Sequence, residues 1–201
     1  MSLFVATWVK FFFLYAPFFV VSMFLSLTRG DNPASRRKVV NRAVLAALAI
    51  SVILLFFGST LFEILGITLD SFRIGSGVLL FLSAVSLVRD GIRTHATGMP
   101  AEERDDISVV PLAIPTIIGP ATIGAILVYG AELKGWDVMI GLLGMLAALA
   151  GLAITLHLSS VFERILGRTG LNILSKITGL ILAAMAAQII LSGVRGFLES
   201  V

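Results

Sequence analysis

Residues 109–122 constrain the fold more than any other segment, because they belong to a hydrophobic stretch of membrane-spanning length that is repeatedly interrupted. The interruptions are Pro111, Pro115, Gly119 and Pro120. A helix in lipid must satisfy its own backbone hydrogen bonds, whereas proline removes a donor and clashes with the preceding turn. We therefore expect the backbone to break here and to line a cavity, as broken helices do in many transporters.

The composition predicts an integral membrane protein. Hydrophobic residues make up 58% of the chain and charged residues 13%, and the mean hydropathy is +1.03. These values exclude an ordinary soluble domain. The net charge of +3 does not indicate nucleic-acid binding, because the basic residues fall in short loops between apolar spans. The expected partner is the lipid bilayer.

The hydropathy pattern predicts an all-α membrane protein with six transmembrane helices. A span needs about 20 apolar residues, and the N-terminus is taken as part of the first span rather than as a signal peptide. An even number of spans places both termini on the same side. The six segments are 4–27, 40–65, 72–88, 107–130, 137–160 and 173–194.

The basic residues predict the orientation of these spans. Lysines and arginines concentrate in the loops after spans one, three and five, and such loops face the cytoplasm. Both termini are therefore predicted outside the cytoplasm. Within one membrane domain, 1–201, we expect a first three-helix unit at 1–90, a cytoplasmic polar linker at 91–106 and a second unit at 107–201.

An internal repeat relates these two units. Residues 14–17 (LYAP) correspond to residues 112–115 (LAIP), and residues 62–66 (FEILG) correspond to residues 162–167 (FERILG). Gly77 has a counterpart in Gly179 in the same way. A three-span unit that is repeated must enter the membrane from opposite sides, so the pattern predicts an inverted 3+3 repeat with broken helices in spans 1 and 4. Chance matches in low-complexity membrane sequence are the alternative.

A break at Pro115 and Pro120 would supply the chemistry of a zwitterion site. The N–H groups at the start of a half-helix attract a carboxylate, and freed carbonyls attract an ammonium group. Thr116 and Thr122 add hydroxyls, and Gly119 allows a ligand to approach the backbone. The alternative is that the prolines only kink a continuous helix.

The sequence offers no competing enzyme or metal site. It lacks a glycine-rich phosphate loop, paired histidines at metal spacing and a nucleophile elbow. With no cysteine, it has no thiolate metal site either. We expect neither an enzyme nor a cofactor.

The motif VPLAIP at 110–115, followed by Gly119-Pro120 and Thr122, resembles the signature of the MarC family of integral membrane proteins. The closing run KITGLIL at 176–182 is also similar to that family. The resemblance implies a small permease of the prokaryotic inner membrane that moves small neutral amino acids such as glycine or alanine.

The first-half motif departs from this family, whose members commonly carry an Asn close to the first proline. Here Pro17 has no such amide beside it, and Tyr15 or Ser22 are the candidates to replace it. In span six, Gln188 would be costly against lipid, so we expect it to point into the bundle and either to contact substrate or to tie helices together.

Two carboxylates are candidates for gating or for coupling to H+ or Na+. Glu63 and Glu163 would lie near opposite faces of the membrane if the repeat is inverted. The alternative is that they are interfacial carboxylates at helix ends.

The sequence thus predicts a secondary transporter that works by alternating access around its broken helices. Two alternatives are an exporter of drugs or metabolites and a non-transporting stress-response or structural membrane protein. A homo-oligomer is compatible with the sequence, which carries no pattern that decides the oligomeric state.

Overall fold

The computed structural model describes residues 2–28, 31–90 and 108–200, and these residues form helices and no strand. The predicted linker at 91–106 lies outside the described residues. In chain order the elements are α1 (Leu3–Leu14), α2 (Pro17–Leu27), α3 (Pro33–Leu65), α4 (Leu69–Asp90), the π-helix η2 (Ser108–Ile117), α5 (Pro120–Glu132), α6 (Trp136–His157) and α7 (Ser159–Ser200).

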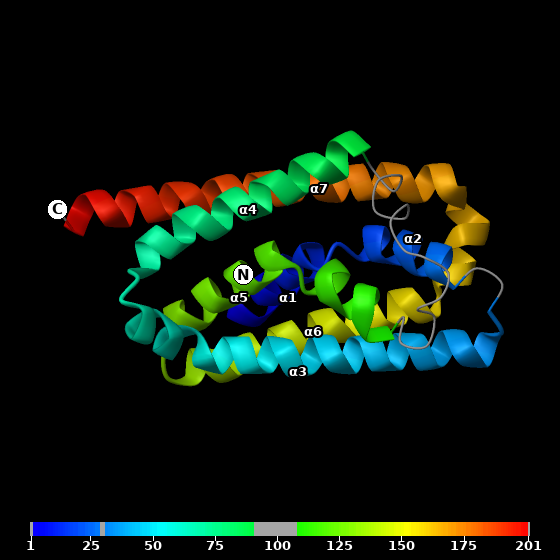
Figure 1. Ribbon diagram of the computed structural model, residues 1–201, viewed down its shortest axis with the longest axis horizontal. Helices are drawn as coiled ribbons and strands as arrows, with labels where there is room; N and C mark the ends of the chain where they lie inside the picture. Colours follow the sequence, from blue (N-terminus) through cyan, green and yellow to red (C-terminus); the bar gives the residue numbers. More distant parts are fainter. Residues whose placement is uncertain (1, 29–30, 91–107, 201) are drawn as a thin grey trace.

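The helices form three layers, with the interrupted ones in the middle (Figure 1). Helices α4 and α7 run side by side in one outer layer, and α3 and α6 form the other. Between them lie α1 with α2 and η2 with α5, which contact both outer layers. Spans one and four therefore lie between the two outer layers, where protein packs against their irregular backbone.

The prediction of an all-helical membrane protein is confirmed. Among the described residues, five helical segments are long and apolar enough to cross a membrane: Leu3–Leu27, Pro33–Phe57, Leu69–Arg89, Trp136–His157 and Ser159–Glu199. The predicted fourth span corresponds to η2 and α5, each of which is too short to cross alone. That η2 and α5 together cross the membrane, and so bring the number of spans to six, stays a prediction.

Helix α3 begins seven residues before the predicted start of span two, because Asn32 and Pro33 form a strong helix start. The Asn32 Oδ1 accepts a hydrogen bond from the Ser35 N–H at 2.7 Å, and Pro33 occupies the first helical position. The basic residues 36–38 therefore extend the helix beyond its apolar part.

Two glycines turn the chain at corresponding places. Gly66 ends α3 with φ 63°, and Gly167 interrupts α7 with φ 62°. This left-handed conformation costs a residue with a Cβ about 1–2 kcal/mol. The pair stands at the ends of the two related motifs, 62–66 and 162–167, and each glycine precedes the last long helix of its half.

The packing of α4 on α7 is reciprocal. A Cβ added to Gly77 would lie 3.2 Å from the Ala186 carbonyl oxygen, and a Cβ added to Gly179 would lie 3.0 Å from the Ala84 carbonyl oxygen. Each helix thus uses a glycine to approach the other's backbone. This exchange agrees with an inverted repeat, which itself stays a prediction.

Candidate functional site

The first break lies between α1 and α2, at Tyr15 and Ala16. Pro17 disfavours the helical region for the residue before it, and Ala16 adopts the left-handed conformation with φ 46° and ψ 59°. The Tyr15 N–H still closes the last turn of α1 on the Phe11 carbonyl at 3.0 Å. Helix α2 then starts at Pro17 with no side-chain cap on its N-terminus.

The second break lies between η2 and α5. The Ile118 N–H bonds to the Ala113 carbonyl at 2.9 Å, which is the wide spacing of a π-helix. Gly119 is extended, with φ −85° and ψ 173°, and Pro120 opens α5. As in α2, no side chain caps the N-terminus. Both breaks therefore lie where the prolines predicted them.

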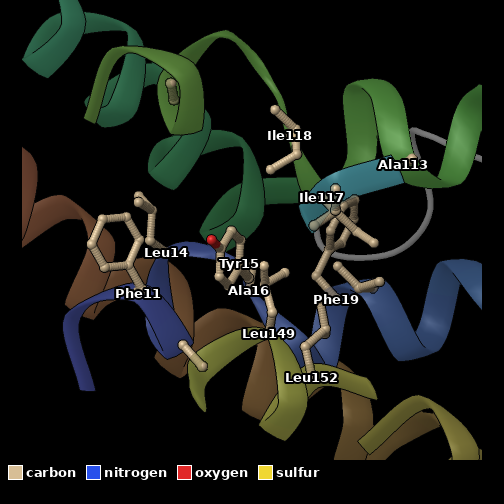
Figure 2. Packing of buried hydrophobic residues seen from close by; sticks show 14 of the residues in the cluster. Phe11, Leu14, Tyr15, Ala16, Phe19, Ala113, Ile117, Ile118, Leu149 and Leu152 are labelled. Atoms are coloured by element: carbon tan, nitrogen blue, oxygen red, sulfur yellow. The ribbon is translucent and has the colours of Figure 1, made fainter. Parts of the chain in front are cut away.

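Residues of both breaks pack into one cluster. Ala16 and Phe19 lie with Ile117 and Ile118 among the buried side chains, and Leu149 of α6 packs beside them (Figure 2). The two interruptions are thus neighbours in space although they are about one hundred residues apart in the chain.

A cavity of about 390 Å³ opens beside the two breaks, and we call it the break cavity. Its volume is in the range of small-molecule sites. One side comes from α1, α2, η2 and α5, and the other from α4 and α7. The lining residues are Leu14, Ala16, Phe19, Leu80, Leu82, Ser83, Ser86, Leu87, Thr116, Gly119, Pro120, Ala121, Thr122 and Leu182.

The electrostatics of the break cavity come from the backbone. Among the described residues, those that line it include no Asp, Glu, Lys, Arg or His. The N-termini of α2 and α5 both open at it, because Ala16 precedes one helix and Gly119 and Pro120 begin the other. Helix N-termini carry partial positive charge and bind anionic groups. The cavity can therefore hold a carboxylate without a basic side chain.

Four of the residues expected to bind substrate line the break cavity together: Thr116, Gly119, Pro120 and Thr122. The side chain of Pro115 lies outside the described part of the chain. These four residues around the second break are thus brought together in one place.

The first-half candidates do not line the break cavity. Tyr15 is fully buried, and its hydroxyl lies 3.3 Å from the Ser51 Oγ of α3, so it ties the first break to an outer helix. Pro17 is buried at the start of α2. The left-handed Ala16 between them faces the cavity instead.

Ser22 and Glu163 lie together at a different cavity, which we call the Ser22 cavity and which measures about 510 Å³. It lies between α2, the end of α4 and the start of α7. The lining residues are Ser22, Leu25, Ser26, Arg89, Glu163, Arg168, Thr169, Leu171, Asn172 and Lys176. The other gating candidate, Glu63, is exposed near the end of α3 and lines none of the cavities described here.

Gln188 lies at a third cavity of about 180 Å³, which we call the Arg73 cavity. Gln188 is exposed, although it also lines this space between α1, α4, α5 and α7. The Arg73 guanidinium there donates to the Glu132 carboxylate at 2.8 Å and also pairs with Asp70. Lys10 sits 4.9 Å from the centre of the Tyr129 ring. Gln188 is therefore close to an ion pair rather than to the breaks.

Sequence reasoning missed two hydroxyls on the far wall of the break cavity. Ser83 and Ser86 of α4 line it, and Ser83 Oγ also donates to the Leu79 carbonyl at 2.9 Å. Two serines three residues apart in an apolar span share one helix face, and that spacing could have identified the wall.

Comparison with known proteins supplies the family context for this site. The family model described as "MarC family integral membrane protein" matches residues 1–198. A UPF0056 membrane protein of Methanocaldococcus jannaschii is 39% identical over 90% of this chain and 91% of its own length. UPF0056 inner membrane protein YhgN of Escherichia coli is 31% identical over 88% of each chain. No solved structure matches the chain.

Proposed function

Since the chain belongs to the MarC family of integral membrane proteins, we propose that it is a secondary transporter of small neutral amino acids such as glycine or alanine. The observation that carries this proposal is the break cavity, where two uncapped helix N-termini open onto one space. A structural protein whose prolines only shape the bundle has no need of such a cavity.

The lining favours a small zwitterion with a neutral side chain. The N-termini of α2 and α5 offer N–H groups to a carboxylate, and the C-terminal carbonyls of α1 and η2 face the same breaks and suit an ammonium group. Leu14, Leu80, Leu87 and Leu182 form apolar walls. A charged ligand side chain would find no opposite charge among the lining residues that the structure describes, whereas hydrogen or methyl fits these walls.

The proposed setting is the inner membrane of a prokaryote, and one relative is named an inner membrane protein. We propose that both termini lie outside the cytoplasm and that the gradient of H+ or Na+ drives transport. Glu163 and Glu63 remain the candidate groups for coupling.

The test is uptake of radiolabelled glycine and alanine by proteoliposomes, with and without imposed proton and sodium gradients. We expect saturable uptake that excess unlabelled substrate competes. Absence of uptake, counterflow and binding across a panel of neutral amino acids would remove this assignment. Efflux of other solutes without amino acid transport would favour the exporter.

A matched pair of glycine variants links transport to the break cavity. Gly119→Leu should abolish uptake, because the side chain fills the space where the ligand approaches the backbone. Gly75→Leu is the control, since a Cβ at this exposed position of α4 meets nothing within 4 Å. Both variants should be folded when they are extracted in detergent. Full uptake by Gly119→Leu would argue against the site.

A further inference from the structure

The Ser22 cavity is separate from the break cavity and has a different character. It shares no lining residue with the break cavity. Polar and charged side chains dominate it, whereas leucines dominate the other. It lies at the end of the bundle where α4 ends and α7 begins (Figure 1).

Two buried polar atoms in this cavity lack a hydrogen-bond partner, namely Ser22 Oγ and Asn172 Oδ1. Within the described part of the chain, no other buried side-chain nitrogen or oxygen is in this state. Ser22 is only 4% exposed. A buried polar group without a partner is costly, so two of them at one cavity indicate that a polar ligand or water completes the site.

These two groups can both donate to an anion. A serine hydroxyl rotates to suit its partner, and an amide can present either its oxygen or its nitrogen by turning about its last torsion. In the second orientation Asn172 offers Nδ2–H beside the Ser22 O–H. The polar groups thus provide donors on the α2 and α7 walls of the cavity.

The charges around the cavity are unbalanced towards positive. Arg168 and Lys176 of α7 line it together with the carboxylate of Glu163, so on the α7 side the described lining residues carry one more positive than negative charge. Arg168 and Thr169 follow Gly167, where the helix restarts after its positive-φ turn. The positive end of that helix therefore adds to the field.

We propose that the Ser22 cavity binds a phosphate group, carried either by a small soluble metabolite or by an anionic lipid headgroup. A phosphomonoester carries a charge of about −1.5 to −2 at pH 7, so it would interact with Arg168 and Lys176 together more strongly than a single carboxylate would. Basic side chains together with the neutral donors Ser22 and Asn172 suit the several oxygens of a phosphate. This site is additional to the proposed transport site and does not depend on it.

The test measures thermal unfolding of the full chain in nanodiscs. Inorganic phosphate is titrated into phosphatidylcholine nanodiscs against sodium chloride of equal ionic strength, and a second set of nanodiscs contains phosphatidic acid. We expect a saturable rise of the melting temperature in at least one arm. A response to inorganic phosphate identifies a soluble ligand, and a response to phosphatidic acid alone identifies a lipid. No response in either arm overturns the proposal.

Paired variants separate this site from general charge effects. Arg168→Gln with Lys176→Gln should weaken the response at least tenfold in apparent affinity. The control, Lys134→Gln with Arg195→Gln, removes the same charge at exposed positions outside the cavity and should leave the affinity unchanged. An equal loss in both double variants would overturn the proposal.

A third variant tests the proposed phosphate site even if the charge variants do not fold. Ser22→Ala removes an unpartnered buried hydroxyl, so in the absence of phosphate it should leave the melting temperature unchanged or raise it. In saturating phosphate it should lose about threefold or more in affinity. Unchanged phosphate affinity in Ser22→Ala would contradict a site built around this hydroxyl.

Discussion

Ala16 occupies a backbone conformation that residues with a Cβ rarely adopt. Its φ of 46° is the one positive φ outside glycine among the described residues. Pro17 disfavours the right-handed helical region at the preceding position, so α1 ends before Ala16. Ala16 lines the break cavity, so the strained backbone lies where the two helix N-termini open.

Ala16→Gly should therefore not destabilise the protein. Removing the Cβ relieves about 1–2 kcal/mol of left-handed strain, while the more flexible unfolded chain costs about 0.4–1 kcal/mol. Ala84→Gly, at a buried helical position of α4, should lose about 1 kcal/mol. Denaturant unfolding in detergent measures both, and equal losses would contradict strain at Ala16.

Thr122 tests the hydroxyls of the break cavity. Thr122→Val keeps the shape and removes one hydrogen bond, so the KM for uptake should rise about tenfold, which corresponds to about 1.4 kcal/mol. Thr155→Val is the control, because that hydroxyl bonds to the Gly151 carbonyl at 2.7 Å and lies outside the cavity. A rise of equal size in both variants would point to a structural effect.

At the scale of the elements, close packing fixes α5 against its neighbours. A Cβ at Gly124 would collide with the Cβ of Ser76 on α4, and a Cβ at Gly130 would collide with the Leu55 carbonyl on α3. Small residues at such crossings let membrane helices approach closely. The half-helix that begins at the second break is thereby held in place from both sides.

For this reason, two alanine substitutions should change the stability of the protein in opposite directions. Gly124→Ala should destabilise the protein by about 1–3 kcal/mol through overpacking. Gly75→Ala should stabilise it by about 0.5–1 kcal/mol, because nothing lies near the added Cβ and alanine favours the helix. Thermal unfolding of the two variants side by side checks this, and a shared sign would contradict the packing at α5.

The sequence predicted the breaks because proline acts locally. Pro17 and Pro120 are the first residues of α2 and α5. Their effect on the backbone does not depend on where these helices pack. It did not predict that Ser22, Gln188 and Thr122 would lie at three different cavities, because the rotation and depth of a helix depend on its neighbours. The π-helix η2 was missed for a similar reason, since no residue type encodes the wider turn.

At the scale of the whole molecule, the cavities on either side of the breaks differ. The Arg73 cavity measures about 180 Å³ and contains the ion pair between Arg73 and Glu132, which joins α4 to α5. The Ser22 cavity measures about 510 Å³. Leu14 lines both the Arg73 cavity and the break cavity, so these two are neighbours. The cavity on the Arg73 side is thus the smaller of the two.

Because the chain contains no cysteine, single introduced thiols can test this difference. Ser22→Cys and Val128→Cys probe the two cavities from positions only 4% and 5% exposed. A membrane-impermeant thiol reagent should modify position 22 faster, and from the cytoplasmic side if the basic loops lie there. Adding Glu132→Gln should speed modification at position 128. Equal rates, or no effect of Glu132→Gln, would contradict closure by the ion pair.

The two helix N-termini at the break cavity have a consequence for inhibition. Their N–H groups belong to the main chain, so only a substitution to proline deletes one of them. A competitive inhibitor that keeps a carboxylate at this position and adds bulk elsewhere would bind to these main-chain N–H groups, which most point mutations do not remove. Resistance to it would have to arise by reshaping the leucine walls, where substitutions also change the fit of the natural substrate.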